Sequence, residues 1–222
     1  MNDAAIALFA KAPEPGRVKT RLVPPLTMED AARVARASLE DTARYIVPEV
    51  PVPWTLFLDG EADSATSDLA REAGMRILPQ EGPELGVRLK AAFRVLREQG
   101  ARRVLAIGSD SPTLDPERIR EAIESLAVCE LTLGPTEDGG YYLIGMTRIH
   151  PELFDDVPWG TADVLRRTQE IAAAIRLNVD LLPMWYDVDH SSDLQRVLHR
   201  RAEGDSVGHY TCAWLKEALR AI

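Results

Sequence analysis

The chain has 222 residues, of which 45% are hydrophobic and 27% charged, and its formal net charge is −9. This length and composition are typical of a soluble globular protein with one large domain and a sizeable core. The acidic balance excludes nucleic acid as a bulk partner, because phosphate backbones are bound by clustered lysine and arginine.

The two cysteines and the short apolar runs indicate where in the cell the protein is expected. Cys129 and Cys212 lie far apart and belong to no CxxC motif or Cys/His cluster, so we expect neither structural zinc nor a disulfide. The sequence shows no signal-peptide pattern, and no apolar run approaches the ~20 residues that cross a membrane. We therefore expect a cytoplasmic protein without a membrane partner.

Short β-like runs alternate with amphipathic helical patterns along almost the whole chain. Strands are predicted at 4–10, 52–58, 75–78, 104–108, 131–134, 141–146 and near 181–188. Helices are predicted from Thr27 to about 46, around 63–73, at 85–98, from 115, from Thr161 or Asp163 to about 175, from Ser191 or Ser192, and at 212–221. This alternation predicts a three-layer α/β/α, Rossmann-like fold with a mostly parallel sheet. The strands at 131–146 predict a hairpin that makes the sheet mixed, within one domain over residues 1–222.

A cationic loop follows the first strand, in the stretch LFAKAPEPGRVKTRL at 8–22. Its basic residues are Lys11, Arg17, Lys19 and Arg21. Ligands of open α/β sheets bind beyond the carboxyl ends of strands, so the loop predicts a clamp for nucleotide phosphates. It is not a Walker A loop, because it has a single glycine, Gly16, and Pro24-Pro25 separates it from the next helix. A solvated basic loop is the alternative interpretation.

Two acidic segments lie at predicted strand ends. In GSDSPTLDP, at 108–116, Asp110 follows a buried strand and is a candidate ligand for Mg²⁺ or Mn²⁺. An Asx turn is the alternative there, and Asp115 fits a helix cap. In WYDVDHSSDLQRV, at 185–197, Asp187 and Asp189 alternate on the predicted strand and face the same side. One of them is a second candidate metal ligand, and the pattern does not decide which.

The stretch GPTEDGGYY, at 134–142, has two interpretations. Asp-Gly-Gly between two β-like runs is a hairpin turn signal. The glycine pair also permits close approach of a ligand, and Tyr141 or Tyr142 is then a candidate to lie against a base or sugar.

Four motifs together resemble a known family. FAKAPEPGRVKTRL, GSDSPTL, LGPTEDGGYYLIG and YDVDHSSDL, in this order, are similar to the bacterial nucleotide-diphospho-sugar transferase-like proteins of the GT-A fold. More closely, they resemble the glycosyltransferase family of arsenosugar biosynthesis. The resemblance spans nearly the whole chain, and the superfamily also includes molybdopterin and 2-phospholactate nucleotidyltransferases.

The resemblance implies roles for particular residues. Asp110 and Asp189 match the metal positions; the phosphate loop comprises Lys11, Gly16, Arg17, Lys19 and Arg21; and Gly139, Gly140 and Tyr141 match the acceptor or sugar side. Glu84 departs from the family, which usually has an aspartate there. Trp159, in PWGTADV, is predicted either to pack or to stack on the acceptor. Gln80 and Arg88 are interpreted as polar residues flanking a helix, with contact to a base or phosphate as the alternative.

The leading hypothesis is a divalent-metal-dependent transferase acting on a nucleotide-linked sugar and a small-molecule acceptor. Lys19 shares the phosphate charge in this hypothesis, and Asp138 is a candidate acid or base. The alternative is a nucleotidyltransferase that moves a nucleoside monophosphate from a nucleoside triphosphate to a phosphorylated acceptor with release of pyrophosphate; four cations suit a triphosphate rather better. A non-catalytic nucleotide-binding module is a third hypothesis. The sequence names neither base, sugar, acceptor nor oligomeric state.

Overall fold

One seven-stranded sheet organises the computed structural model, which describes residues 3–202 and 208–220. Its strands are β1 (Ala4–Lys11), β2 (Trp54–Asp59), β3 (Arg76–Pro79), β4 (Arg103–Gly108), β5 (Leu131–Pro135), β6 (Tyr141–Met146) and β7 (Val179–Leu181). Their order is β3-β2-β1-β4-β6-β5-β7. Only β6 runs antiparallel to its neighbours, β4 and β5. The predicted mostly parallel, mixed sheet with a hairpin at 131–146 is therefore confirmed.

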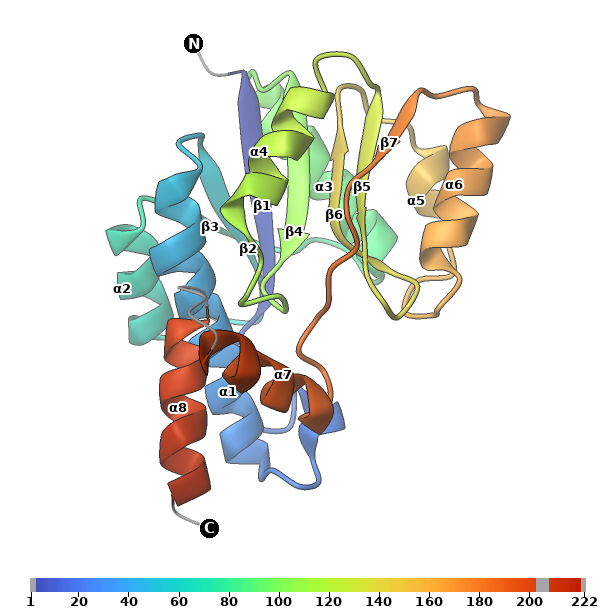
Figure 1. Ribbon diagram of the computed structural model, residues 1–222. Helices are drawn as coiled ribbons and strands as arrows, with labels where there is room; N and C mark the ends of the chain where they lie inside the picture. The colour runs from blue at the N-terminus through green and yellow to red at the C-terminus, as the bar shows by residue number, and fades with distance from the viewer. Residues whose placement is uncertain (1–2, 203–207, 221–222) are drawn as a thin grey trace.

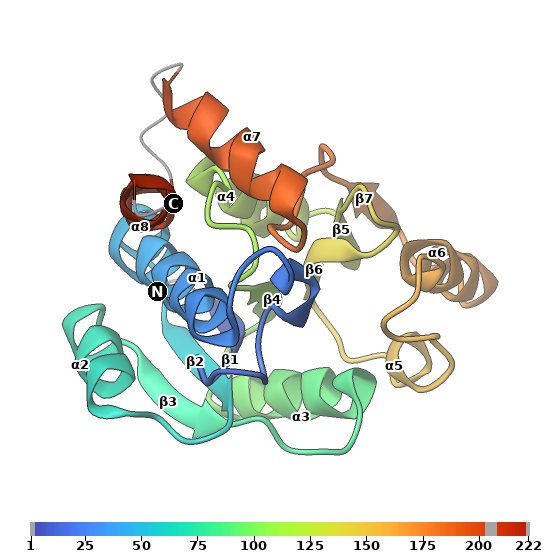
Figure 2. The same ribbon diagram turned by 90° about the horizontal axis from the view of Figure 1, so that it is seen from below.

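Helices cover both faces of the sheet (Figures 1 and 2). α1 (Met28–Asp41), α2 (Ser64–Glu72) and α4 (Pro116–Ser125) contribute to one apolar cluster, and α3 (Leu85–Glu98), α5 (Glu152–Asp155) and α6 (Val164–Ala174) to the other. α7 (Ser191–Ala202) and α8 (His209–Arg220) pack with α1 in a third cluster. Three short helical turns, η1 (Thr20–Leu22), η2 (Thr42–Ile46) and η3 (Val47–Glu49), complete the elements. The three-layer arrangement matches the expected α/β fold.

β1 explains why a continuous apolar run forms the centre of the sheet. Ile6 and Leu8 point into the first cluster, whereas Ala5, Ala7 and Phe9 point into the second. Because successive side chains of a strand face opposite sides, a strand covered on both faces needs apolar residues at every position. Its pairing with β2 and β4 on either side places Lys11, its last residue, at the middle of the carboxyl edge.

The predicted strand near 181–188 is largely wrong. β7 ends at Leu181, and beyond it the chain follows β5 only through separate hydrogen bonds, from Leu182 N to Leu133 O and from Trp185 N to Pro135 O, and an isolated bridge between Trp185 and Thr136. Pro183 lacks the backbone N–H that a sheet ladder needs, which accounts for the early end. The last helix begins at His209 rather than at 212, and α5 was not predicted.

The helix caps that the sequence predicts at Thr27 and Asp115 are present in the structure. The Thr27 side chain accepts a hydrogen bond from Asp30 N at the start of α1, and Asp115 accepts one from Glu117 N at the start of α4. Cys129 and Cys212 are not joined in a disulfide. No helix in the described part of the chain is long and apolar enough to cross a membrane.

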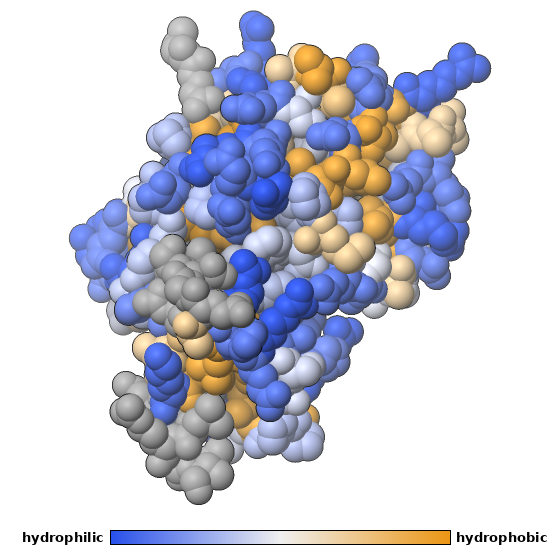
Figure 3. All heavy atoms as spheres, viewed as in Figure 1, coloured by the Kyte–Doolittle hydropathy of each residue, from blue (hydrophilic) through white to orange (hydrophobic). Residues whose placement is uncertain are grey.

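On the face shown in Figure 3, apolar colour gathers over the β5–β7 side of the sheet and hydrophilic residues predominate elsewhere. That the whole chain from 1 to 222 forms a single domain stays a prediction.

Candidate functional site

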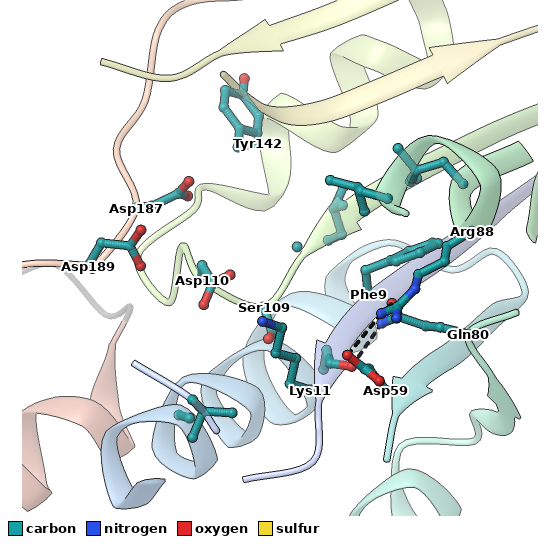
Figure 4. A pocket seen from close by; sticks show the side chains of 18 of the residues that line it. Phe9, Lys11, Asp59, Gln80, Arg88, Ser109, Asp110, Tyr142, Asp187 and Asp189 are labelled. Carbon is teal, nitrogen blue, oxygen red and sulfur yellow. Dashed lines mark hydrogen bonds and ion pairs between the residues drawn. The ribbon is translucent and has the colours of Figure 1, made fainter. Parts of the chain in front are cut away.

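A cavity of ≈ 690 Å³ opens at the carboxyl ends of the parallel strands. The last residues of β1, β2 and β4 line it, Gln80 joins them directly after β3, and the first residues of β6 also contribute. Ligands of open α/β sheets bind at this edge. We therefore take this cavity as the candidate active site (Figure 4).

The buried ammonium of Lys19 lies between two carboxylates from distant parts of the chain. Its Nζ forms one ion pair with Asp110, which follows β4, and a second with Asp189 at 3.1 Å. Arg21 Nη1 contacts the other oxygen of Asp189 at 3.3 Å. A backbone hydrogen bond of 2.8 Å from Val188 N to Asp110 O holds the two acidic segments together. The cationic loop and both predicted metal positions therefore converge on one point.

The charges in this group stabilise one another. Burial by itself raises the pKa of Asp110, but the ammonium of Lys19, with Lys11 further away, brings that pKa below its usual value. Burial lowers the pKa of Lys19, whose side chain is 4% exposed, yet the charges of Asp110 and Asp189 outweigh burial and raise it. At neutral pH Lys19 is therefore a cation and Asp110 an anion.

Asp187 adds a third carboxyl group on the same side of the cavity. Burial and the charge of Asp110 raise the pKa of Asp187 to about 7, and a hydrogen bond from the Ser111 hydroxyl opposes this only in part. Figure 4 shows Asp187, Asp189 and Asp110 gathered at one end of the cavity. The raised pKa reflects burial first and the neighbouring negative charge second, and an added cation would oppose both by favouring the ionised carboxylate.

The donor set fits a hard divalent cation. Asp110 and Asp189 already hold one positive charge between their oxygens, and Mg²⁺ and Mn²⁺ prefer oxygen ligands. Across the described ranges, no group of three or more His, Cys, Asp or Glu side chains is arranged to hold an ion. Because Mg²⁺ is usually bound by one or two carboxylates together with substrate phosphates and water, two acids suffice.

The structure divides the predicted phosphate loop. Lys11, Lys19 and Arg21 line the cavity. Arg17 does not, because its guanidinium pairs with Glu14 at 3.0 Å on the exposed side of the loop. Gly16 also lies outside the cavity lining and supplies a turn at φ +81°. The predicted phosphate contacts of Arg17 and Gly16 therefore lack support from this geometry.

The hairpin turn between β5 and β6 accounts for three predicted substrate contacts. Asp138 Oδ1 accepts hydrogen bonds from Thr136 Oγ1 at 2.6 Å and from Gly140 N at 3.1 Å. Gly139 has φ +88°, and a Cβ there would lie 2.1 Å from the carbonyl oxygen of Ala162. None of Asp138, Gly139 and Gly140 lines the cavity. Their residue types follow from the turn, and contact of these three residues with substrate stays a prediction.

Trp159 packs rather than facing the cavity. Its Nε1 donates to Phe154 O at 3.1 Å, and a Cβ on Gly86 would lie 2.3 Å from that nitrogen. Tyr141 does line the cavity, while its ring contacts Trp159 edge-on at 6.1 Å between centroids. Of the two interpretations of Trp159, the geometry therefore favours packing.

A second polar group lies at the other end of the cavity and comprises Asp59, which the sequence analysis does not single out, with Gln80 and Arg88, for which contact with a base or phosphate is the alternative interpretation. Arg88 Nη1 pairs with Asp59 Oδ2 at 2.8 Å and contacts Gln80 Oε1 at 3.3 Å. Asp59 is the last residue of β2, and Asp110 similarly follows the end of β4. An acid at the carboxyl end of a predicted strand was therefore the sequence signal that could have identified Asp59 as a site residue. Glu84 precedes α3, makes no capping hydrogen bond and does not line the cavity.

Known proteins share this architecture. A "putative nucleotide-diphospho-sugar transferase" from Desulfovibrio desulfuricans G20 is 31% identical, with a TM-score of 0.85 over 98% of this chain and 95% of that one. A nucleotidyl transferase from Methanothermobacter thermautotroptrophicus is 15% identical, with a TM-score of 0.55 over 89% and 96% of the two chains. A Mycobacterium tuberculosis H37Rv protein in complex with manganese is 18% identical, with a TM-score of 0.50 over 87% and 96%. No curated protein matches the chain.

The Desulfovibrio structure confirms the resemblance that the four motifs predicted, and it supports the expectation of a transferase. The two more distant structures share the fold. Residues 42–161 match the family described as "Uncharacterized protein conserved in bacteria (DUF2064)". The match covers more than half of the chain, which therefore belongs to this family.

Proposed function

We propose that the chain is a divalent-metal-dependent transferase that uses a nucleotide-diphospho-sugar and a small-molecule acceptor in the cytoplasm. The observation that carries this proposal is the buried Lys19 between Asp110 and Asp189, in one cavity at the strand ends. A nucleotide with its divalent cation needs neighbouring charges of both signs. The 31% identical "putative nucleotide-diphospho-sugar transferase" supports the substrate class.

Lys11, Lys19 and Arg21 bind the two phosphates in this proposal. Lys11 ends β1, is exposed at the cavity and has no ion pair with the residues that the structure describes. Arg21 offers a planar fork of donors to phosphate oxygens, whereas each lysine acts as a point charge. Lys19 stays protonated because of its two carboxylate neighbours. The leaving nucleoside diphosphate therefore forms in a cationic environment.

Asp110 and Asp189 are the residues that would hold the cation, since both face the same ammonium. Asp187 instead accepts a hydrogen bond from Ser111 and is the lesser candidate. When bound, a divalent cation supplies positive charge where the leaving diphosphate gains negative charge. The manganese in the similarly folded Mycobacterium protein makes Mn²⁺ our first choice for assays.

The distribution of charge favours two phosphates over three. Arg17 pairs with Glu14 away from the cavity, and both Lys19 and Arg21 already contact Asp189. The cavity therefore offers less uncompensated positive charge than the four cations of the loop suggest. A nucleotidyltransferase acting on a triphosphate remains the rival that the experiment must separate.

Product analysis tests the proposal. The protein is incubated with Mn²⁺ and a panel of nucleotide sugars and nucleoside triphosphates, with and without candidate acceptors, and the released compounds are separated by anion exchange. We expect a nucleoside diphosphate from a nucleotide sugar. Release of pyrophosphate from a triphosphate would replace the proposal with nucleotidyl transfer. Binding with no turnover of any donor would favour a non-catalytic module.

Two aspartates provide a matched pair of variants. Asp110→Asn removes a charge from the proposed metal site and should abolish both Mn²⁺-dependent nucleotide binding and product release. Asp115→Asn changes the same group five residues further on, where Asp115 caps α4 outside the cavity lining. It should retain both properties. Equal behaviour of the two variants would refute the role of Asp110.

A further inference from the structure

The end of the cavity opposite the carboxylates carries a preformed guanidinium group. Figure 4 shows Arg88, Gln80 and Asp59 together on one side, with Asp187 and Asp189 on the other. Arg88 and Asp59 are largely buried, with side chains 23% and 26% exposed.

Backbone contacts fix this group before any ligand arrives. The Gln80 amide nitrogen donates to Ala10 O at 2.9 Å and to Phe57 O at 3.0 Å, which orients the amide oxygen toward Arg88. Arg88 Nε donates to Gly82 O at 2.8 Å. Since β1 and β2 hold the glutamine and the glutamine helps to hold the arginine, the guanidinium is anchored to the sheet.

Two N–H groups of Arg88 are left for a ligand. A guanidinium has five N–H donors; the Nε donor binds Gly82 O, and Nη1 binds Asp59 and Gln80. The contacts among the described residues use no donor on Nη2. Arg88 lines the cavity, so a bound molecule that places an acceptor against Nη2 completes the hydrogen bonding of a largely buried group.

The balance of charge at this end of the cavity suits an uncharged hydrogen-bond acceptor on the ligand rather than another phosphate. Asp59 compensates the charge of Arg88 at 2.8 Å, whereas Lys11, nearer the acids, has no ion pair with described residues. Phe9, Pro83 and Leu89 line the same cavity and provide apolar surface. A nucleobase has two flat apolar faces and an edge that carries hydrogen-bond acceptors, so it matches both the apolar lining and the free donors of Arg88.

We propose that Arg88, oriented by Asp59 and Gln80, selects the base of the nucleotide by donating to a ring carbonyl oxygen. Cytosine, uracil and guanine carry such an oxygen, whereas adenine presents an amino donor beside its ring nitrogens. The inference rests on the proposed function, because it assumes that a nucleotide occupies the cavity with its phosphates at Lys19. It adds that adenine nucleotides are the disfavoured class.

Calorimetric titration with CDP, UDP, GDP and ADP, each in the presence of Mn²⁺, tests this selection. For the wild type we expect at least one of the first three to bind about tenfold tighter than ADP, the effect of one hydrogen bond to a charged donor. Arg88→Met should bring that preference below about threefold while ADP binding changes little. Arg94→Met is the matched control, because Arg94 lies exposed on the same helix outside the cavity lining and should leave the preference intact.

Arg88→Lys guards against a folding defect, since it keeps a cation beside Asp59 but presents no planar fork. It should melt close to the wild type and still lose base preference. Equal weakening of all four nucleotides in both Arg88 variants would overturn the inference, because Arg88 would then act on phosphate or on folding. Wild-type binding without preference, or with preference for ADP, would overturn it too. Failure of the wild type to bind any nucleotide would refute the proposed function itself, and this inference with it.

Discussion

Replacing Lys19 by methionine removes the positive charge at the centre of the acidic group and keeps most of the aliphatic volume. The side chain is 4% exposed and pairs with both Asp110 and Asp189. After the substitution three carboxyl groups, including Asp187, face one another without their shared counter-ion. We therefore expect the variant to be less stable than the wild type at neutral pH.

The expected loss is moderate because water reaches the acids. Breaking a buried ion pair costs about 3–5 kcal/mol, but the side chains of Asp110 and Asp189 are 53% and 32% exposed. Solvation of the freed carboxylates reduces the loss in unfolding free energy to about 2 kcal/mol. For a chain of this size that corresponds to a fall in melting temperature of about 4–8 °C.

The dependence on pH separates charge from packing. Lys19 holds the pKa of Asp110 below its ordinary value, so in the wild type this carboxylate contributes stability above about pH 4 and loses it as pH falls through the lowered pKa. The variant lacks that contribution. Its deficit should be complete at pH 7.5 and shrink as the pH falls below about 4, where the Asp110 carboxylate of the wild type takes up its proton. Calorimetric melting of both proteins across this range measures it, and added Mn²⁺ should raise the variant's melting temperature more than that of the wild type.

Lys11→Met is the matched control. Lys11 also lines the cavity, but it is exposed and has no ion pair with described residues, so the same substitution should leave the melting temperature within about 1 °C. A Lys19→Met deficit that is the same at about pH 3 and at pH 7.5 would show that lost packing dominates. A deficit no larger than that of Lys11→Met would refute the electrostatic argument altogether.

Three further substitutions test other parts of the structure. Asp41→Ala removes a fully buried carboxylate that accepts three hydrogen bonds at the first turn of α8 and should lower the unfolding free energy by about 3 kcal/mol in urea titration. Gly86→Ala places a Cβ 2.3 Å from Trp159 Nε1, so thermal melting should show a loss of about 1–3 kcal/mol; an unchanged melting temperature would contradict the packing of Trp159. Asp138→Ala should cost about 1 kcal/mol and preserve donor turnover, because its carboxylate bonds within the hairpin turn; lost turnover with an intact fold would restore it as a catalytic candidate.

The central strands were predictable because burial on both faces requires apolar residues at consecutive positions. Runs such as 4–10 and 104–108 are apolar at every position, and their short length favours a strand buried on both faces over a helix. The segment 182–190 shows the limit of the method. Trp185 and Tyr186 resemble strand residues, but the rings stack with each other and lie under the guanidinium groups of Arg200 and Arg196, contributed by α7. Only the tertiary arrangement reveals that those aromatic faces are covered by a helix rather than by a neighbouring strand.

The candidate site was predictable where residue type and strand end coincide, and less so elsewhere. Asp110 follows a recognisable strand, and its loop lies in the cavity. Asp138 sits in an equally polar, glycine-rich stretch, yet its geometry is that of a turn. Asp-Gly-Gly serves a hairpin and a ligand loop with the same residues, so its role depends on which side faces the cavity. Arg88 was given little weight because a helix surface normally carries such residues.

The cationic loop also shows why charges in a sequence do not translate directly into ligand contacts. Of its basic residues, Arg17 neutralises Glu14, while Lys19 and Arg21 lie against Asp189. A phosphate that enters the cavity can therefore meet Lys11 directly, but at Lys19 and Arg21 it must exchange with ion pairs. The exchange is inexpensive at Arg21, which is 59% exposed, since exposed pairs contribute only about 0–1 kcal/mol. It is harder at the buried Lys19, unless a divalent cation takes over Asp110 and Asp189. Phosphate contact by Lys19 and cation binding by the two acids therefore depend on each other.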